Sequence, residues 1–334
     1  MSNNIFIYGE ISENGLFADV VIELLGVANN LAAKLENAKI TVVSPYDFKG
    51  DFSKNIEQLK EYGCDQLIVV DDTCLSYYTT EFFAPAVTAV IKEFAPSIVL
   101  IGATVQGRDL APKISTALGT GLTADCTGLD INEKGQLAAT RPTFGGNLMA
   151  TILCSNMPQM ATVRPNVFPK IKEEKNIQTE LIKFNFDFSQ IKNRVELCEI
   201  IPLPKLADVN LADAQIIVAG GRGMKTADGF QLIEKLAKLI GGSPAASRGA
   251  VDMKIAPSTI QVGQTGKTVA PKIYIACGIS GAIQHTVGMS SADVIIAINN
   301  NPKAKIFEIA DYAIVEDAFE ILPKWIELIE KSNG

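Results

Sequence analysis

The sequence is poor in the residues that bind metals and cross-link small domains. Its 334 residues include one histidine, His285, and six cysteines. The cysteines form no C-x-x-C pair and no Cys/His cluster, and they stand at Cys64, Cys74, Cys126, Cys154, Cys198 and Cys277. We therefore expect no zinc or iron–sulfur site and no disulfide framework, and we interpret the cysteines as thiols in a reducing compartment.

Positive charge and long apolar runs are also scarce. The formal net charge is −7 and no run of Lys and Arg exceeds a few residues, so we expect no surface for nucleic acid or anionic lipid. Residues 1–8 lack the basic segment and long apolar segment of a signal peptide. No apolar stretch reaches the roughly 18 residues of a membrane span without a charge, glycine or proline. The sequence predicts a cytoplasmic protein without membrane insertion.

What the sequence does contain is the alternation of an α/β protein. Hydrophobic residues make up 47% of the chain, whose length exceeds that at which one core usually stops growing. Helix-length amphipathic stretches follow each of the first apolar strand candidates, at 4–10, 40–44, 66–71 and 97–102. Unbroken apolar runs of this kind are typical of a parallel sheet that is covered on both faces.

Two changes of pattern divide the rest of the chain. Turn residues separate the next strand candidates, at 137–141, 148–154, 159–163 and 181–188, which predicts an antiparallel extension of the first sheet. Prolines and polar residues then interrupt the pattern at 199–215, so we place a domain boundary there. The prediction is an N-terminal α/β domain over 1–205 and a C-terminal domain over 206–334.

The C-terminal part repeats the strand–helix alternation. Its helix candidates are 227–240 and 318–331, and its strand candidates are 215–219, 245–248, 260–264, 273–277, 294–298 and 312–315. This order predicts a small doubly wound, Rossmann-like domain.

A glycine-rich turn, Val218-Ala-Gly-Gly-Arg-Gly-Met224, follows the first strand of this domain. Its glycines allow a tight turn and a close approach to a phosphate, and the next helix offers free N–H groups. Arg222 in the turn is suited to meet an anion. The alternative for this motif by itself is a tight turn without a ligand.

Polar residues follow the later strands of the domain as well. They are Ser247, Arg248 and Asp252; Gln264 and Thr265; Gly278, Ser280, Gly281 and His285; and Asn299, Asn300 and Asn301. Each group alone also fits ordinary turn chemistry or a surface ion pair. Together they are a denser polar set than turns require, and they suit a long ligand with several phosphates and sugars.

Two other interpretations fail on spacing. The segment 263–267 (GQTGK) is no P-loop, because Gln261 stands where the first glycine is required. Ser280 and His285 lack the nucleophile elbow of a hydrolase, because Ala282 replaces its last glycine. A lone histidine is more often a structural hydrogen-bond partner, and no second metal ligand accompanies it.

These segments resemble a known family. SRGAVD (247–252), residues 261–289, AINNNP (297–302) and ADYAIVED (310–317) are similar, almost residue for residue, to the FAD domain of electron transfer flavoprotein α subunits. Residues 101–131 and RPTFGGN (141–147) are similar to the N-terminal part of the same subunit. The resemblance covers essentially the whole chain.

The resemblance implies that the N-terminal domain contacts a β subunit and that FAD lies in the C-terminal domain, with its isoalloxazine ring near that subunit. It implies that Arg248 lies beside the ring, Thr265 hydrogen-bonds the N5 region and His285 approaches the C2 carbonyl. A guanidinium there would stabilise the negative charge of a reduced flavin and raise its potential. The implied FAD contacts are Arg222, Ser247, Arg248, Val262, Gly263, Gln264, Thr265, Ser280, Gly281, Ala282, Ile283, Gln284, His285, Asn299, Asp317 and Ala318.

The implied function is that of the α subunit of a heterodimer, an electron carrier without a catalytic acid or base of its own. Its electrons would be exchanged with flavin dehydrogenases such as acyl-CoA dehydrogenases. In one mode the β subunit binds AMP; in the other it holds a second FAD, oxidises NADH and bifurcates the electrons. The alternatives are a stand-alone nicotinamide-dependent dehydrogenase and a non-redox nucleotide-binding scaffold.

Overall fold

The computed structural model describes residues 3–143, 148–173, 178–192, 194–200, 211 and 214–332. The chain divides into two compact units, Met1–Ile200 and Ile201–Gly334. The boundary predicted between residues 205 and 206 lies outside the described residues, as do residues 144–147 of the RPTFGGN segment. No helix in the described ranges is both long and apolar enough to cross a bilayer.

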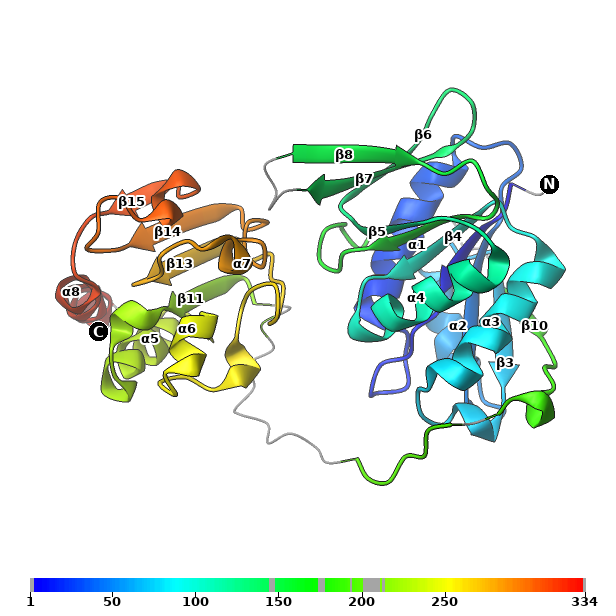
Figure 1. Ribbon diagram of the computed structural model, residues 1–334, viewed down its shortest axis with the longest axis horizontal. Helices are drawn as coiled ribbons and strands as arrows, with labels where there is room; N and C mark the ends of the chain where they lie inside the picture. Colours follow the sequence, from blue (N-terminus) through cyan, green and yellow to red (C-terminus); the bar gives the residue numbers. More distant parts are fainter. Residues whose placement is uncertain are drawn as a thin grey trace. The chain divides into compact units, whose positions relative to one another are not determined.

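A seven-stranded sheet with parallel pairing throughout forms the centre of the first unit (Figure 1). Its strand order is β10-β3-β2-β1-β4-β9-β5. The strands are β1 (Ile5–Tyr8), β2 (Ile40–Tyr46), β3 (Gln66–Asp71), β4 (Ile98–Gly102), β5 (Leu122–Cys126), β9 (Gln159–Val163) and β10 (Glu180–Lys183). Both faces of this sheet are buried, because Ile5 and Ile7 of β1 pack into one apolar cluster while Phe6 and Tyr8 pack into another.

Helices supply the other side of each cluster. Residues of α1 (Asp19–Ala32) and α2 (Ser53–Lys60) belong to the cluster with Ile5 and Ile7. Residues of α3 (Thr80–Phe94) and α4 (Val105–Leu118) belong to the other. Short 3-10 turns lie at Thr73–Leu75 and Phe188–Gln190. This two-sided cover explains why the strands carry unbroken apolar runs.

A separate three-stranded antiparallel sheet completes the first unit. It has the order β6-β7-β8, with β6 (Gly128–Ile131), β7 (Leu137–Thr143) and β8 (Leu148–Leu153). The predicted combination of a parallel sheet with an antiparallel part is confirmed. The assignment of 159–163 and 181–188 to the antiparallel part was wrong, because β9 and β10 pair in parallel with β4 and β3.

The second unit has a five-stranded parallel sheet with the order β12-β11-β13-β14-β15 (Figure 1). Its strands are β11 (Ile216–Gly220), β12 (Ser243–Ala246), β13 (Ile273–Cys277), β14 (Val294–Ile298) and β15 (Tyr312–Ile314). Its helices are α5 (Ala227–Leu239), α6 (Arg248–Asp252), α7 (Ile283–Thr286) and α8 (Ala318–Ser332), with 3-10 turns at Arg222–Met224, Ser258–Ile260 and Lys305–Glu308. One apolar cluster unites the sheet with α5 and α8.

One predicted strand of this unit is not a member of the sheet. Residues 260–264 begin at the end of a 3-10 turn, and only isolated bridges join Gln261 to Ala246 and Val262 to Lys267. Gly263 interrupts the segment after Val262, so no continuous ladder forms.

Candidate functional site

The strand order of the second unit creates a crevice between β11 and β13. The chain passes from β11 to β12 on one side, and β13 then pairs on the other side of β11. The loops after β11 and β13 therefore leave in opposite directions. Open α/β sheets bind ligands at such a switch point, beyond the carboxyl ends of the strands.

Glycines join the two loops at this point. The N–H of Gly221 donates to the Cys277 carbonyl at 2.8 Å, and that of Gly223 donates to the Gly278 carbonyl at 3.1 Å. A Cβ atom on Gly221 would lie 2.2 Å from the Gly278 oxygen, and one on Gly223 would lie 2.6 Å from the Gly278 Cα. The glycines of the first motif thus serve close contact between two loops, a role that the sequence did not indicate.

A cavity of about 750 Å³ lies at this edge of the sheet. Its volume falls in the range of roughly 300–1,000 Å³ that is usual for ligand pockets. The predicted contacts that line it are Arg222, Ser247, Arg248, Val262, Gly263, Thr265, Ser280, Ala282, Gln284, His285 and Asn299. Residues that follow β11, β12, β13 and β14 are thereby brought together.

The remaining predicted contacts are not in the cavity wall. Gln264 is adjacent to it, where its N–H donates to the Gln284 carbonyl at 2.7 Å. Gly281 packs against the backbone of Ile306, and Ile283 is exposed at the start of α7. Asp317 and Ala318 begin α8, where Asp317 is 3.5 Å from the Lys225 ammonium.

Several lining residues were not predicted as contacts. They are Gly223, Gly249, Asp252, Met253, Gln261, Gly278 and Ile279. The glycine turns contained a signal for Gly223 and Gly278. Met253 and Ile279 carry no such signal, because an apolar residue that lines a cavity cannot be told from a core residue in the sequence.

Two arginines and one aspartate belong to the cavity wall. Ser247 begins α6 by accepting a hydrogen bond from the Ala250 N–H, which places Arg248 in the first turn of the helix. The Nε atom of Arg248 is 3.6 Å from a carboxylate oxygen of Asp252. A Cβ atom on Gly249 would lie 2.7 Å from the Cγ atom of Arg222, so Arg222 packs over this glycine. The surplus of positive charge suits an anionic ligand.

His285 is buried in the same wall, and both of its ring nitrogens have partners. Nδ1 is 3.0 Å from the Val262 carbonyl oxygen, and Nε2 is 3.0 Å from the Tyr274 hydroxyl. Burial lowers the pKa of His285 to about 4, although the hydrogen bond to Val262 opposes this shift. The ring is therefore neutral at pH 7.

The partners of this neutral ring also fix its tautomer. A carbonyl oxygen can only accept, so Nδ1 carries the proton and Nε2 accepts from the Tyr274 hydroxyl. Neither nitrogen is free to act as the base of Ser280, and a hydrogen bond to a ligand requires the exchange of one of these two bonds.

Other polar side chains of the wall are fixed by the protein itself. The Asn299 amide donates to the Ile279 carbonyl at 2.9 Å, and its oxygen accepts from the Asn301 N–H. The Thr265 hydroxyl accepts from the Gln261 amide at 3.1 Å. No three potential metal ligands gather anywhere in the described residues. The cavity therefore offers charge and fixed dipoles rather than an acid–base pair.

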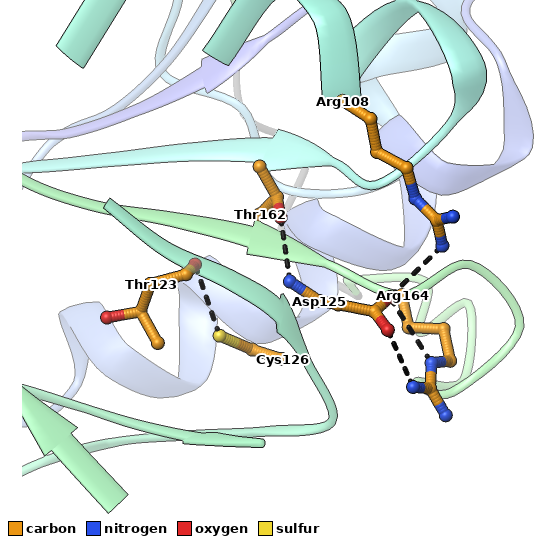
Figure 2. Close-up of polar contacts among 6 residues, drawn as sticks. All are labelled: Arg108, Thr123, Asp125, Cys126, Thr162 and Arg164. Carbon is orange, nitrogen blue, oxygen red and sulfur yellow. Dashed lines mark hydrogen bonds and ion pairs between the residues drawn. The ribbon is translucent and has the colours of Figure 1, made fainter. Parts of the chain in front are cut away.

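A second polar cluster lies in the first unit, where β5 and β9 end (Figure 2). Asp125 accepts from Nη2 of Arg164 at 2.7 Å and from Arg108 at 3.2 Å, and its own N–H donates to the Thr162 hydroxyl. Burial alone would raise the pKa of Asp125, but the hydrogen bond from Arg164 and the nearby arginine charges lower it. Asp125 has a left-handed backbone, with φ of 60°, at a bulge in β5. No local feature of the chain predicted this cluster.

A parallel α/β unit with a cationic cavity at its switch point is the architecture of a nucleotide-cofactor-binding domain. Residues 210–290 match the family model described as "Electron transfer flavoprotein FAD-binding domain", and residues 5–189 match "Electron transfer flavoprotein domain". The chain belongs to the electron transfer flavoprotein α-subunit family, and the cofactor of its second unit is FAD.

Curated relatives agree over nearly the full length. The chain is 48% identical to the electron transfer flavoprotein subunit alpha of Thermoanaerobacterium thermosaccharolyticum, with 98% of each chain covered. It is 45% identical to protein FixB of Clostridium saccharobutylicum, over 96% of this chain and 95% of the relative. It is 42% identical to the electron transfer flavoprotein subunit alpha of Megasphaera elsdenii, over 96% and 94%.

Proposed function

We propose that this chain is the FAD-holding subunit of a heterodimer with an electron transfer flavoprotein β subunit, and that it exchanges electrons with flavin dehydrogenases such as acyl-CoA dehydrogenases. The observation that carries the proposal is the cavity at the switch point, with Arg222 and Arg248 in its wall. The two phosphates of FAD are anionic, and the cavity volume of about 750 Å³ is suited to most of a dinucleotide. The residues therefore fit the cofactor.

The residues that we propose as FAD contacts are those named from the sequence, with Arg248 at the flavin end. FAD supplies the redox chemistry when it is bound. Arg248 is free to approach a ligand, because its side chain is 67% exposed and its one ion-pair partner among the described residues, Asp252, lies at 3.6 Å. Its permanent charge favours added negative charge beside it. Gln264, Gly281, Ile283, Asp317 and Ala318 would bind outside the cavity, along its rim.

The neutral state of His285 is part of the proposed role. A buried ring that cannot gain a proton near pH 7 keeps the charge of the pocket constant. The positive charge beside the flavin then comes from the arginines alone. The proposed pocket thus tunes a potential and does not transfer protons through His285.

The β subunit as partner is supported by the names of several relatives, which are called subunit alpha. We further propose the bifurcating mode, in which the β subunit holds a second FAD and oxidises NADH. Its support is the resemblance of the sequence to bacterial α subunits. Two FAD per heterodimer and NADH oxidation by the complex are the expected results, and one FAD with bound AMP would contradict this mode. We place the complex in the cytoplasm.

A visible absorption spectrum tests the main function. The chain co-expressed with its β subunit should show bands near ~370 and ~450 nm, which are typical of bound flavin. Binding of NAD by the isolated chain without these bands would support the nicotinamide-dependent dehydrogenase. A colourless protein that binds neither cofactor would support the scaffold and overturn the proposal.

A further inference from the structure

The charged cluster at the ends of β5 and β9 contains more positive than negative charge. Arg108 and Arg164 approach the carboxylate of Asp125 from two different elements, and both form ion pairs with it (Figure 2). Arg141 of β7 is a third arginine, and its charge also lowers the pKa of Asp125. Three guanidinium groups against one carboxylate leave two positive charges of this cluster uncompensated.

The backbone places Arg141 beside this cluster. The residue after Cys126 donates its N–H to the Thr140 carbonyl at 2.9 Å, so β7 lies against the end of β5 at this point. Side chains alternate along a strand, and Arg141 therefore shares the face of Ala139. Ala139 is buried in the same apolar cluster as Cys126. The Arg141 side chain thus points toward the ends of β5 and β9.

A buried donor of Arg141 has no acceptor. Its Nε atom is buried and has no hydrogen-bond partner among the described residues. The two ion pairs of the cluster use Arg108 and Arg164, and Arg164 is only 6% exposed, so solvent does little to compensate its charge. Buried donors and charges are costly when they lack partners, and an unsatisfied group of this kind is explained by a bound ion or water.

The chemistry of the cluster favours a phosphate group over a carboxylate. A phosphate monoester carries a charge of about −1.5 to −2 near pH 7, which balances the two uncompensated charges, whereas a carboxylate balances only one. Guanidinium groups also bind phosphate oxygens in a bidentate manner. The side chain of Arg108 is 52% exposed, so a solute can reach the cluster from its side.

We propose that Arg108, Arg141 and Arg164 form a phosphate-binding site within the first unit, beyond the carboxyl ends of β5 and β9. This is the edge of a parallel sheet at which open α/β folds bind ligands. Asp125 orients the guanidinium groups of Arg108 and Arg164, and the phosphate oxygens accept from their remaining N–H groups and from Nε of Arg141. The site does not depend on the heterodimer of the proposed function.

The first test titrates inorganic phosphate into the full-length chain loaded with FAD, by calorimetry at constant ionic strength. FAD is present so that the arginines of the second unit are occupied. We expect one saturable site, and Arg141→Gln should weaken its phosphate binding by about tenfold or more, because a charge-assisted hydrogen bond is lost. This variant leaves both ion pairs of the cluster intact.

Arg194→Gln is the matched control for the loss of one positive charge. Arg194 is exposed and lies outside any helix or strand, so the affinity of this variant for phosphate should equal that of the wild type. No saturable binding by the wild type, unchanged affinity of Arg141→Gln, or an equal loss in Arg194→Gln would overturn the site.

Two further probes test the choice of ligand. Acetate should bind at least tenfold more weakly than phosphate, because it balances only one charge; equal affinity would overturn the choice of a phosphate. Glycerol phosphate separates the two sources of the group. Tighter binding than inorganic phosphate would support a small phosphate ester as the ligand, and weaker binding would support the free ion.

NMR of the wild-type chain locates the site directly. The chain has six arginines, so ¹⁵N-arginine labelling gives at most six Nε–H signals, and Arg141→Gln and Arg194→Gln each assign one of them by its disappearance. Phosphate should shift the Arg141 signal, because its Nε–H gains an acceptor. The Arg194 signal should not move. An unmoved Arg141 signal at saturating phosphate, or an equal shift of Arg194, would overturn the proposal.

Discussion

His285 should remain neutral well below physiological pH, and the chain is well suited to a direct test. It is the only histidine, so labelling with ¹⁵N-histidine gives one pair of ring signals. A pH titration by NMR should place the pKa of His285 near 4, with the proton of the neutral ring on Nδ1. A pKa near 6.5, or a neutral ring protonated on Nε2, would refute the reasoning.

The magnitude follows from the burial of the ring, which outweighs the opposing hydrogen bond to Val262. A fall in pKa from 6.5 to about 4 corresponds to roughly 3 kcal/mol, because each pKa unit is worth about 1.4 kcal/mol. Between these pH values the unfolded chain binds more protons than the folded one, so stability falls as pH falls. The stability that neutral His285 contributes to the folded chain is fully present above pH 6.5 and is lost as pH approaches 4.

Tyr274→Phe tests whether the hydrogen bond at Nε2 adds to the effect of burial. The variant removes the hydroxyl that donates to Nε2 and leaves the ring buried. The neutral ring loses a hydrogen bond worth about 1 kcal/mol, so the pKa of His285 should rise by roughly one unit. An unchanged pKa in this variant would show that the hydroxyl does not stabilise the neutral ring.

Three further predictions concern charged groups. Arg248→Ala should lower the midpoint potential of the bound flavin by roughly 30–60 mV, because about 1.5–3 kcal/mol of charge stabilisation is lost. Arg248→Lys is the charge-preserving control. An unchanged spectroelectrochemical titration of Arg248→Ala would contradict the assigned role. Burial raises the pKa of Glu23 from 4.5 to about 7, against the hydrogen bond from the Asn166 N–H, so this residue makes stability fall as pH rises from 4.5 to 7. Glu23→Gln should reduce that fall in stability by at most about 3 kcal/mol, measured by urea unfolding at pH 5 and pH 8. An equal pH dependence in the variant and the wild type would contradict this role of Glu23. Asp125→Ala should lower the free energy of unfolding by about 3–5 kcal/mol, because Arg164 is left buried without its ion-pair partner. Arg108→Ala should lower it by about 1 kcal/mol or less, because Arg108 is exposed. Equal losses in the two variants would show that the burial of Arg164 is unimportant.

The parallel sheets were predictable because their strands are buried on both faces. β1, β2, β3 and β4 each combine an unbroken apolar run with a following helix, and this local pattern is sufficient. β9 and β10 were misassigned because their partners are distant in the sequence. β9 pairs with β4 only after the chain has made the excursion through β6, β7 and β8, and no local feature of residues 159–163 reports this.

The candidate site was predictable in its position but not in its internal bonds. Glycines and polar residues after successive strands indicated the edge of the sheet where the cavity lies. The partners of His285 could not be read in the same way, because Tyr274 looks like a core residue of β13 and Val262 contributes only its carbonyl. The charged cluster around Asp125 was missed for a related reason: its members come from separate elements and meet only in the folded chain (Figure 2).

The bond between Tyr274 and His285 has a consequence for protein engineering. Tyr274 is fully buried in β13, so a designer who repacks the sheet would treat it as a volume to be filled. Its hydroxyl nevertheless donates to Nε2 of the cavity histidine, whose tautomer is set by the Val262 carbonyl. Replacement by leucine or phenylalanine would then alter the electrostatics of the cofactor site from behind the sheet, without a change in any residue of its wall. In this domain, repacking of the core and the hydrogen bonding of the cofactor site are not independent design variables.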